Sequence, residues 1–320
     1  MSFGGPEKPD DVIPFLENVL RGKNVPRERM LQVAEHYYHF GGRSPINDQN
    51  RALISELQKL LDAEGPDLPI YWGNRNWHPM LADTLSQMRE DGIKNALAFF
   101  TSAFSSYSGC RQYRENIAAA GNGRPNIEKL RAFYNHPGFL NPMIDKVRAA
   151  LEQLPGAPVA FTAHSIPISM AVTSPYVAQL EEACKLVASG AGAGDYKLVY
   201  QSRSGPPTQP WLEPDIADHI RSLQAAGRKE IVIAPIGFIS DHMEVLYDLD
   251  TEAAELCREL GMRMIRAATV GTHLDFIKMI RQLILERVEP GTPRLVLGRS
   301  SPCPDVCPAD CCPAPAARRP

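Results

Sequence analysis

The chain has 320 residues, of which 44% are hydrophobic and 22% charged, and its formal net charge is -3 at pH 7. These values are ordinary for a globular protein, and without a basic stripe interleaved with aromatic residues they argue against a nucleic-acid binder. No apolar stretch is long enough to span a bilayer, and the N-terminus lacks the layout of a signal peptide. We therefore predict a cytoplasmic protein with two domains of ordinary size.

The chain opens on an unusual junction. Residues 2–7 read Ser-Phe-Gly-Gly-Pro-Glu, the composition of a strand-to-helix turn, yet no strand precedes them. A parallel sheet built from this chain would then lack one member, which we expect to be a central one. We expect either that the true start lies upstream or that the chain is shortened.

Strand-like apolar runs then alternate with amphipathic helical patterns. The strand candidates are residues 69–72, 95–102, 159–164, 197–201, 231–238 and 264–270. The helix candidates include residues 47–64, 80–91, 142–154, 176–188, 215–226, 245–260 and 273–288. This alternation predicts an α/β protein with parallel sheets covered by helices on both faces. Weak patterning over residues 121–138 places the boundary between two halves near this stretch.

Three carboxylates follow the strand candidate at residues 231–238. Glu244, Asp248 and Glu252 stand at i, i+4 and i+8, so a helix would stack them as one column. Like charges at this spacing repel, and a cation or a mobile proton would offset the repulsion. The alternative is a solvated acidic first turn, which the helix dipole also favours. The position at the carboxyl end of a strand favours a site.

A histidine ends another strand candidate. His164 closes residues 159–164 and is followed by the rigid turn Ser-Ile-Pro. Taken alone, such a residue is more often a hydrogen-bonded structural histidine. Because the carboxyl ends of parallel strands meet at one edge of a sheet, His164 and Glu244 could face one crevice. A neutral imidazole opposite a column of carboxylates indicates proton abstraction or delivery of a divalent cation.

Aromatic residues and arginines gather at further strand and helix ends. Residues 37–46 contain Arg43, residues 71–77 contain Arg75, and Trp211 follows a later strand candidate. Rings that stack and guanidinium groups that pair with carboxylates suit a flat, anionic, aromatic ligand. Taken singly, each aromatic residue is better explained as part of the core.

The seven cysteines are unevenly spread. Cys184 and Cys257 sit in helical patterns and are interpreted as core residues, whereas Cys110 follows a strand candidate. The other four crowd into a proline-rich tail: Cys303, Cys307, Cys311 and Cys312. Its prolines prevent a regular helix and it has little apolar surface, so we expect metal–thiolate bonds to fix the tail to the first half.

Seven blocks of residues together resemble the ferrochelatase family. The blocks are residues 2–7, 39–47, 73–77, 106–113, 162–167, 201–207 and 240–244. They follow the family's order from residue 2 to about residue 252, which is nearly the whole chain. In detail the chain looks most like the actinobacterial type, whose members typically work on coproporphyrin III.

The resemblance implies two Rossmann-like, doubly wound domains of the class II chelatase kind, with a porphyrin cleft between them. Residues 1–135 would form the first domain, completed by a helix that crosses back within residues 272–298. Residues 136–271 would form the second domain, and residues 299–320 the tail. The implied activity is insertion of Fe²⁺ into a porphyrin in haem biosynthesis, with at most transient contact with neighbouring enzymes of the pathway.

The resemblance also implies roles for individual residues. His164 and Glu244 match the family's catalytic pair, which faces the macrocycle and contacts the metal. Asp248 and Glu252 would continue an acidic path along which metal or protons travel. Phe3 matches the position that faces the porphyrin from the other side, where relatives carry Tyr or Met. Because Phe cannot ligate iron, Phe3 can only pack.

Three further residues are weaker candidates for contact with the porphyrin. Arg43 and Arg75 would pair with its propionates, and Trp211 would lie against the ring. The choice between coproporphyrin III and protoporphyrin IX stays open at this point.

The cysteines acquire a meaning from the same resemblance. Cys110 matches the internal ligand of the [2Fe–2S] cluster that some ferrochelatases carry, and the other three ligands come from the tail. We expect Cys303, Cys307 and one of the pair Cys311 and Cys312, whose spacing matches no known ferredoxin pattern. A zinc site and tail disulfides are the alternatives, and a reducing cytoplasm disfavours the disulfides.

A second class of function is a non-catalytic haem or porphyrin binder that serves as a redox sensor on the same scaffold. His164 and Glu244 favour the enzyme, because a pure binder needs neither a base nor an acidic column. Insertion of cobalt into a less oxidised tetrapyrrole is a further alternative, but the chain lacks the histidine pairs expected for it.

Overall fold

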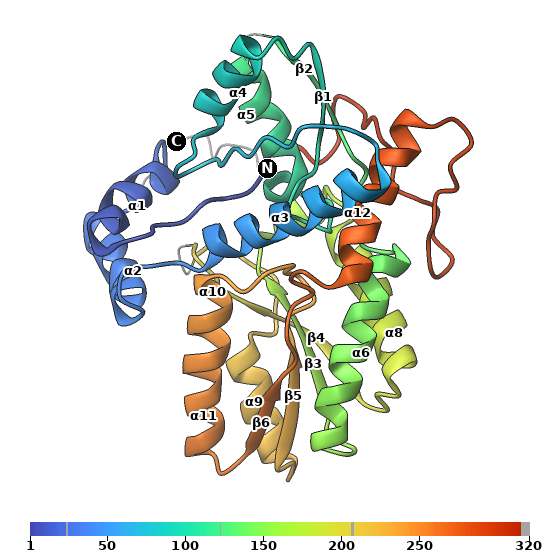
Figure 1. The fold of residues 1–320 in the computed structure, drawn as a ribbon. Helices are drawn as coiled ribbons and strands as arrows, with labels where there is room; N and C mark the ends of the chain where they lie inside the picture. Colours follow the sequence, from blue (N-terminus) through green and yellow to red (C-terminus); the bar gives the residue numbers. More distant parts are fainter. Residues whose placement is uncertain (24, 122, 206–207, 315–320) are drawn as a thin grey trace.

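The computed structural model describes residues 1–23, 25–121, 123–205 and 208–314. Two residues of the 201–207 block and the last six of the tail therefore lie outside the described part. One parallel sheet lies in each half of the chain, and α3 crosses between the two halves (Figure 1). The predicted α/β class with parallel sheets is confirmed.

The larger sheet has the strand order β4-β3-β5-β6. All its strands are paired in parallel: β3 (Val159–His164), β4 (Tyr196–Gln201), β5 (Glu230–Ala234) and β6 (Arg263–Arg266). Successive residues of β3 enter opposite cores. Phe161 lies in the core shared with α6 (Pro137–Gln153) and α8 (Tyr176–Ala191), and Ala160 in that shared with α9 (Ile216–Ala225) and α11 (Ala254–Glu259). Burial on both faces is typical of a doubly wound sheet.

The smaller sheet pairs β1 (Asn95–Ala98) with β2 (Asn126–Lys129). Of the helices in this half, α4 (Leu81–Glu90) and α5 (Gln112–Gly121) pack against this sheet, whereas α1 (Val12–Leu20) and α2 (Arg27–His39) form a cluster of their own. The half also contains η1 (Pro9–Asp11) and α3 (Ile46–Glu64). The amino group of Met1 donates to the Phe99 carbonyl at 2.7 Å, and Ser2 forms a single parallel bridge with Asn74. The first residues therefore run beside this sheet, between residues 73–76 and 99–101.

Two expectations about elements were wrong. Residues 69–72 form no strand, and the pairing nearest to them is the bridge at Asn74. The weakly patterned residues 121–138 contain a strand that was not predicted, β2, because the polar sequence Asn-Ile-Glu-Lys of this edge strand carries no apolar pattern. Residues 245–260 are not one α-helix. They are divided among α10 (Met243–Val245), the π-helix η3 (Leu246–Ala253) and α11.

The chain returns to its first half through α12 (Leu274–Val288), which packs against both α3 and α6. The start of α6 meets α12 closely, because a Cβ on Gly138 would lie 2.6 Å from Met279 Cβ. The domain limits given above stay a prediction. Among the helices of the described residues, none has the length and apolar character needed to cross a membrane.

Candidate active site

His164 is the last residue of β3, and its ring is fixed by its neighbours. Its Nδ1 contacts the carbonyl oxygen of Ser165, so this nitrogen carries the donated hydrogen and Nε2 faces outward. Nε2 lies 3.6 Å from Glu244 Oε1. The side chains of His164 and Glu244 are 32% and 45% exposed, so a ligand can reach both. The structure thus brings the two residues together.

The pair is charged at neutral pH. Burial alone would lower the pKa of His164, but the nearby carboxylate of Glu244 raises it to about 9. Burial would raise the pKa of Glu244, but His164 and His242 lower it to about 2. The sequence-based interpretation had a neutral imidazole here, whereas the charge of Glu244 favours the protonated ring, because it outweighs desolvation.

The carboxylate column begins with Glu244 on α10 and continues with Asp248 and Glu252 on η3, where backbone bonds run from i to i+5 and the turn is wider than in an α-helix. Asp248 accepts hydrogen bonds from the Ser202 hydroxyl and from Gln201 Nε2. Burial, together with the charges of Glu244 and Glu252, still raises the pKa of Asp248 to about 7. The three predicted carboxylates are therefore close enough to interact, and Asp248 can hold a proton near neutral pH.

The outer end of the column is more open. Burial raises the pKa of Glu252, and the neighbouring carboxylates of Asp215 and Glu255 raise it further. Neighbouring acids, rather than cations, therefore dominate the surroundings of Glu252. A cation arriving from solvent would relieve the repulsion among these carboxylates.

Two glutamines that the sequence patterns did not single out hold the segment that carries Glu244. Gln201, the last residue of β4, donates from Nε2 to the Glu244 carbonyl at 3.0 Å. Gln49, in the first turn of α3, exchanges two hydrogen bonds with the backbone of Asp241. A long-range amide contact leaves no periodic signal in the sequence, so only the position of Gln201 at a strand end could have indicated a role.

Phe3 and Arg75 lie together in the first half. The guanidinium carbon of Arg75 lies 5.8 Å from the centre of the Phe3 ring and 4.9 Å from that of Tyr113. Arg75 Nε donates to Asn116, a neutral amide, at 2.8 Å. Burial and the charge of Arg75 lower the pKa of Lys23, which marks a second cation nearby. A cation over an exposed ring, with a second cation near the first, forms a surface that suits an aromatic anion.

The other two porphyrin candidates are placed differently. Arg43 forms an ion pair with Asp48 at the surface. Trp211 is only 9% exposed and pairs through a single bridge with Pro167. Neither contacts His164 or Glu244 directly in the described structure. Trp211 packs as a core residue here, in line with the alternative that each aromatic residue, taken singly, belongs to the core.

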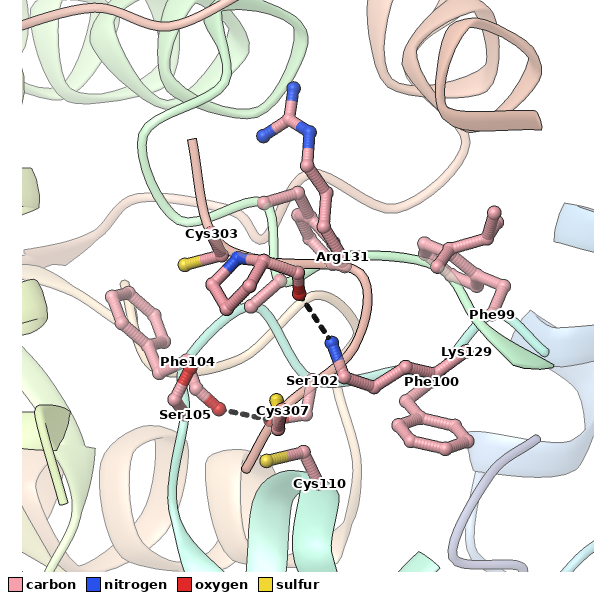
Figure 2. Close-up of a pocket in the computed structure, with 14 residues that line it drawn as sticks. Phe99, Phe100, Ser102, Phe104, Ser105, Cys110, Lys129, Arg131, Cys303 and Cys307 are labelled. Atoms are coloured by element: carbon pink, nitrogen blue, oxygen red, sulfur yellow. Dashed lines mark hydrogen bonds between the residues drawn. The ribbon is translucent and has the colours of Figure 1, made fainter. Parts of the chain in front are cut away.

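All seven cysteine thiols are free. Cys110, on the π-helix η2 (Tyr107–Arg111), lines a cavity of about 30 Å³ with Cys303 and Cys307 (Figure 2). The Cys312 thiol donates a hydrogen bond to Cys110, and this bond, aided by Lys129, lowers the pKa of Cys110 to about 6. The sulfurs of Cys311 and Cys312 lie 3.5 Å apart.

Cys303 has its own surroundings within this group. Its sulfur accepts from Gln179 Nε2 at 3.5 Å, and Figure 2 shows it directed away from the sulfurs of Cys110 and Cys307. Across the described residues, no group of three or more His, Cys, Asp or Glu side chains is placed to hold a metal ion.

Hydrogen bonds also dock the tail, and the expectation that metal–thiolate bonds fix it stays a prediction. Lys129 Nζ donates to the Pro304 carbonyl at 2.8 Å and Arg294 to the Cys303 carbonyl at 2.8 Å. Arg111 donates to the Cys311 carbonyl at 3.2 Å. Cationic side chains outside the tail thus donate to backbone carbonyls of the tail. Proline lacks a backbone N–H but keeps its carbonyl, so a proline-rich tail can still accept these bonds.

The fold and site together define an α/β protein that handles protons and cations at the carboxyl edge of a parallel sheet. A base, a row of carboxylates and a cationic aromatic surface are the parts needed to bring a metal ion to a flat anion. This chain belongs to the ferrochelatase family, whose model matches residues 1–288.

Relatives agree with this assignment over nearly the full length. A ferrochelatase of Rhodopirellula baltica is 61% identical, covering 98% of this chain and 92% of the relative. A coproporphyrin III ferrochelatase of Streptomyces coelicolor is 51% identical over 99% and 93%. Among solved structures, SirB from Bacillus subtilis with Fe³⁺ matches with a TM-score of 0.49 and 11% identity, over 76% of this chain and 92% of that one.

The family assignment decides between the two classes of function. The chain is an enzyme that inserts Fe²⁺ into a porphyrin in haem biosynthesis, as predicted. The alternative of a non-catalytic sensor finds no support in these relatives.

Proposed function

We propose that this ferrochelatase acts on coproporphyrin III, with His164 and Glu244 as its catalytic pair. The observation that carries the proposal is their 3.6 Å contact at the sheet edge, where both are open to a ligand. The name of the Streptomyces coelicolor relative supports the substrate. Arg75 beside Phe3, with Lys23 near Arg75, suits a macrocycle rich in carboxylates.

The charged state of the pair suggests an order of events. An imidazolium cannot accept a proton, so His164 must first lose one. Fe²⁺ beside Glu244 would cancel the negative charge that raises the pKa of His164, and the imidazole would then release its proton. The neutral ring can then accept a pyrrole proton as iron enters the macrocycle. Arrival of iron therefore activates the base.

Asp248 and Glu252 would carry iron inward and protons outward. Hard carboxylate oxygens bind Fe²⁺ weakly enough to release it. A carboxyl with a pKa of about 7 can take the proton that leaves His164 and pass it on. Phe3, Arg43 and Arg75 would hold the porphyrin, Phe3 by packing only.

The test is anaerobic insertion of Fe²⁺, assayed with coproporphyrin III and protoporphyrin IX side by side and followed by the Soret shift. We expect kcat/KM to be higher for coproporphyrin III. A preference for protoporphyrin IX would refute the substrate assignment, and no insertion into either porphyrin would refute the catalytic proposal.

We also propose that the tail and Cys110 together hold a [2Fe–2S] cluster, with Cys303, Cys307 and one of the vicinal pair as further ligands. The donor set fits, because soft thiolates suit iron–sulfur clusters and all of these thiols are free. We favour Cys312 over Cys311 as the fourth ligand, because Cys312 is 3% exposed and its thiol is hydrogen-bonded to Cys110. The cluster would supply metal–thiolate links between the tail and the first half.

Single Ser replacements test the ligand set through colour and iron content. We expect loss of the visible absorption in Cys110→Ser, Cys303→Ser and Cys307→Ser, and retention in the core controls Cys184→Ser and Cys257→Ser. Replacing Cys311 alone should leave the colour. A colourless protein with stoichiometric zinc, or a coloured Cys110→Ser variant, would contradict the proposal. A cytoplasmic location and transient contacts with pathway enzymes stay predictions.

A further inference from the structure

Glu244 and Phe3 belong to different halves of the molecule, and their spacing must suit the macrocycle between them. Glu244 follows a loop after β5, whereas Phe3 follows Ser2 at the start of the chain. Something must set the position of that loop against the first half. One side chain makes a direct polar link between the two.

Gln49 reaches from α3 to the loop before Glu244. Its Nε2 donates to the Asp241 carbonyl at 2.6 Å, and its Oε1 accepts from the Asp241 N–H at 2.8 Å. One amide thus satisfies both backbone groups of one residue, as a neighbouring strand would. Two opposed hydrogen bonds fix orientation as well as distance.

Both ends of this link are held firmly. On the α3 side, the buried Asn50 donates to the Ser2 hydroxyl at 2.9 Å, next to Phe3. On the loop side, the Asp241 carboxylate pairs at 3.1 Å with Arg266, which also binds Asp250 on η3. The Gln49 link therefore joins α3 to the loop at Asp241, and further side-chain contacts hold each of these two segments in place.

The fixed loop leads directly to the catalytic carboxylate. His242 caps α10, with its Nδ1 accepting from the Glu244 N–H at 3.2 Å. A shift of Asp241 would therefore move the cap and, with it, the carboxylate that faces His164. We propose that Gln49 is a positioning residue that sets the place of Glu244 relative to the first half, an inference that rests on the proposed role of Glu244.

Gln49→Met keeps the length of the side chain and removes both hydrogen bonds. We expect kcat for iron insertion to fall about tenfold, because small misplacements of a catalytic group are costly. KM for the porphyrin should stay within about twofold, since its binding groups are untouched. Gln49→Glu keeps the acceptor for the Asp241 N–H and should recover part of the loss.

Gln58→Met is the matched control. Gln58 lies on the same helix and bonds only to Asp62, at 2.7 Å on the surface. We expect its kinetics to equal those of the wild type. Equal kcat in Gln49→Met and Gln58→Met would overturn the proposal, as would a Gln49→Glu variant no better than Gln49→Met.

Hydrogen exchange of the peptide covering residues 237–245 gives a second readout that needs no catalysis. Exchange should be faster in Gln49→Met than in Gln58→Met, because the Asp241 N–H loses its acceptor. Unchanged exchange would overturn the link itself. If the wild type inserts no iron while exchange responds as expected, then the proposed catalytic role fails and the link stands.

Discussion

The charges of one pair of side chains, His164 and Glu244, would link metal binding to proton transfer at this site. Glu244 raises the pKa of His164 and His164 lowers that of Glu244, so under the proposed mechanism the base would be protonated until metal arrives. A cation that binds Glu244 would lower the pKa of His164, so the imidazole would lose its proton. Proton removal would thus follow metal arrival, which keeps the two steps in order.

His164→Ala should abolish insertion while the fold and porphyrin binding persist. General acid–base groups contribute roughly 10²–10⁴-fold to a rate, so kcat should fall by that factor. Stopped-flow insertion and porphyrin titration measure the two properties separately. Retention of more than about a tenth of the wild-type kcat would rule out the role.

Asp248→Asn should change how stability depends on pH. The pKa of Asp248 is raised from 3.8 to about 7, so the folded protein keeps a proton that the unfolded chain releases. This carboxyl therefore contributes stability at low pH that is lost as pH rises towards 7. The Asn variant lacks that loss, so it should gain stability relative to wild type between pH 4 and 8.

Urea unfolding of both proteins at several pH values measures this difference. We expect the gap to widen with pH by an amount on the order of 1 kcal/mol or more. A gap independent of pH would mean that Asp248 titrates normally in the folded protein.

Local sequence signals located some site residues and not others. His164 was found because it ends an apolar run, and Glu244 because of its acidic repeat. Gln49 and Gln201 act through hydrogen bonds with residues far away in the sequence, which no periodicity encodes. The charge state of His164 also depends on a partner 80 residues away, so the sequence alone suggested a neutral ring.

At the scale of elements, two π-helices carry chemistry-bearing residues. η3 bears Asp248 and Glu252, and η2 bears Cys110. Such segments are rare and occur often at functional sites. Residue pattern alone predicts the commoner α-helix, because a carboxylate repeat of four fits both. The switch of hydrogen-bond partner is set by tertiary contacts such as those of Asp248 with β4.

Glu252→Gln tests whether η3 conducts iron. If the column guides the metal, KM for Fe²⁺ should rise more than KM for the porphyrin, because only the cation meets this residue. Steady-state kinetics with each substrate varied in turn give both constants. Equal effects on the two constants, or no effect, would favour a solvated acidic face.

Strands were predicted well where they are buried and poorly where they are exposed. β3 and β5 are apolar runs within a few residues of their expected limits. β2 was not predicted, because an edge strand in contact with solvent needs no apolar pattern.

Across the whole molecule, a buried ion pair ties the last helix to the first half. Arg131 and Glu286 on α12 are 0% and 1% exposed and meet through two hydrogen bonds at 2.7 and 2.9 Å. Arg294 also approaches Glu286, and it donates to the Cys303 carbonyl. This network connects α12 to the docked tail.

Glu286→Gln should leave Arg131 buried without its counter-charge. We expect the free energy of unfolding to fall by about 3–5 kcal/mol, measured by urea denaturation. The exposed pair of Arg148 and Asp145 offers a control, since Asp145→Asn should cost at most about 1 kcal/mol. A loss in Glu286→Gln as small as the control's would show that water reaches the buried pair.

The close meeting of Gly138 with α12 has a consequence for engineering. The segment that builds the larger sheet leaves and rejoins the rest of the chain at nearly one point, since Gly138 would clash with Met279 if it carried a Cβ. Such a segment can be exchanged as a unit, because a short linker can join the two chain ends that its removal leaves. The half that contains the larger sheet could therefore be exchanged for that of a relative while the half that contacts the cysteine tail is kept.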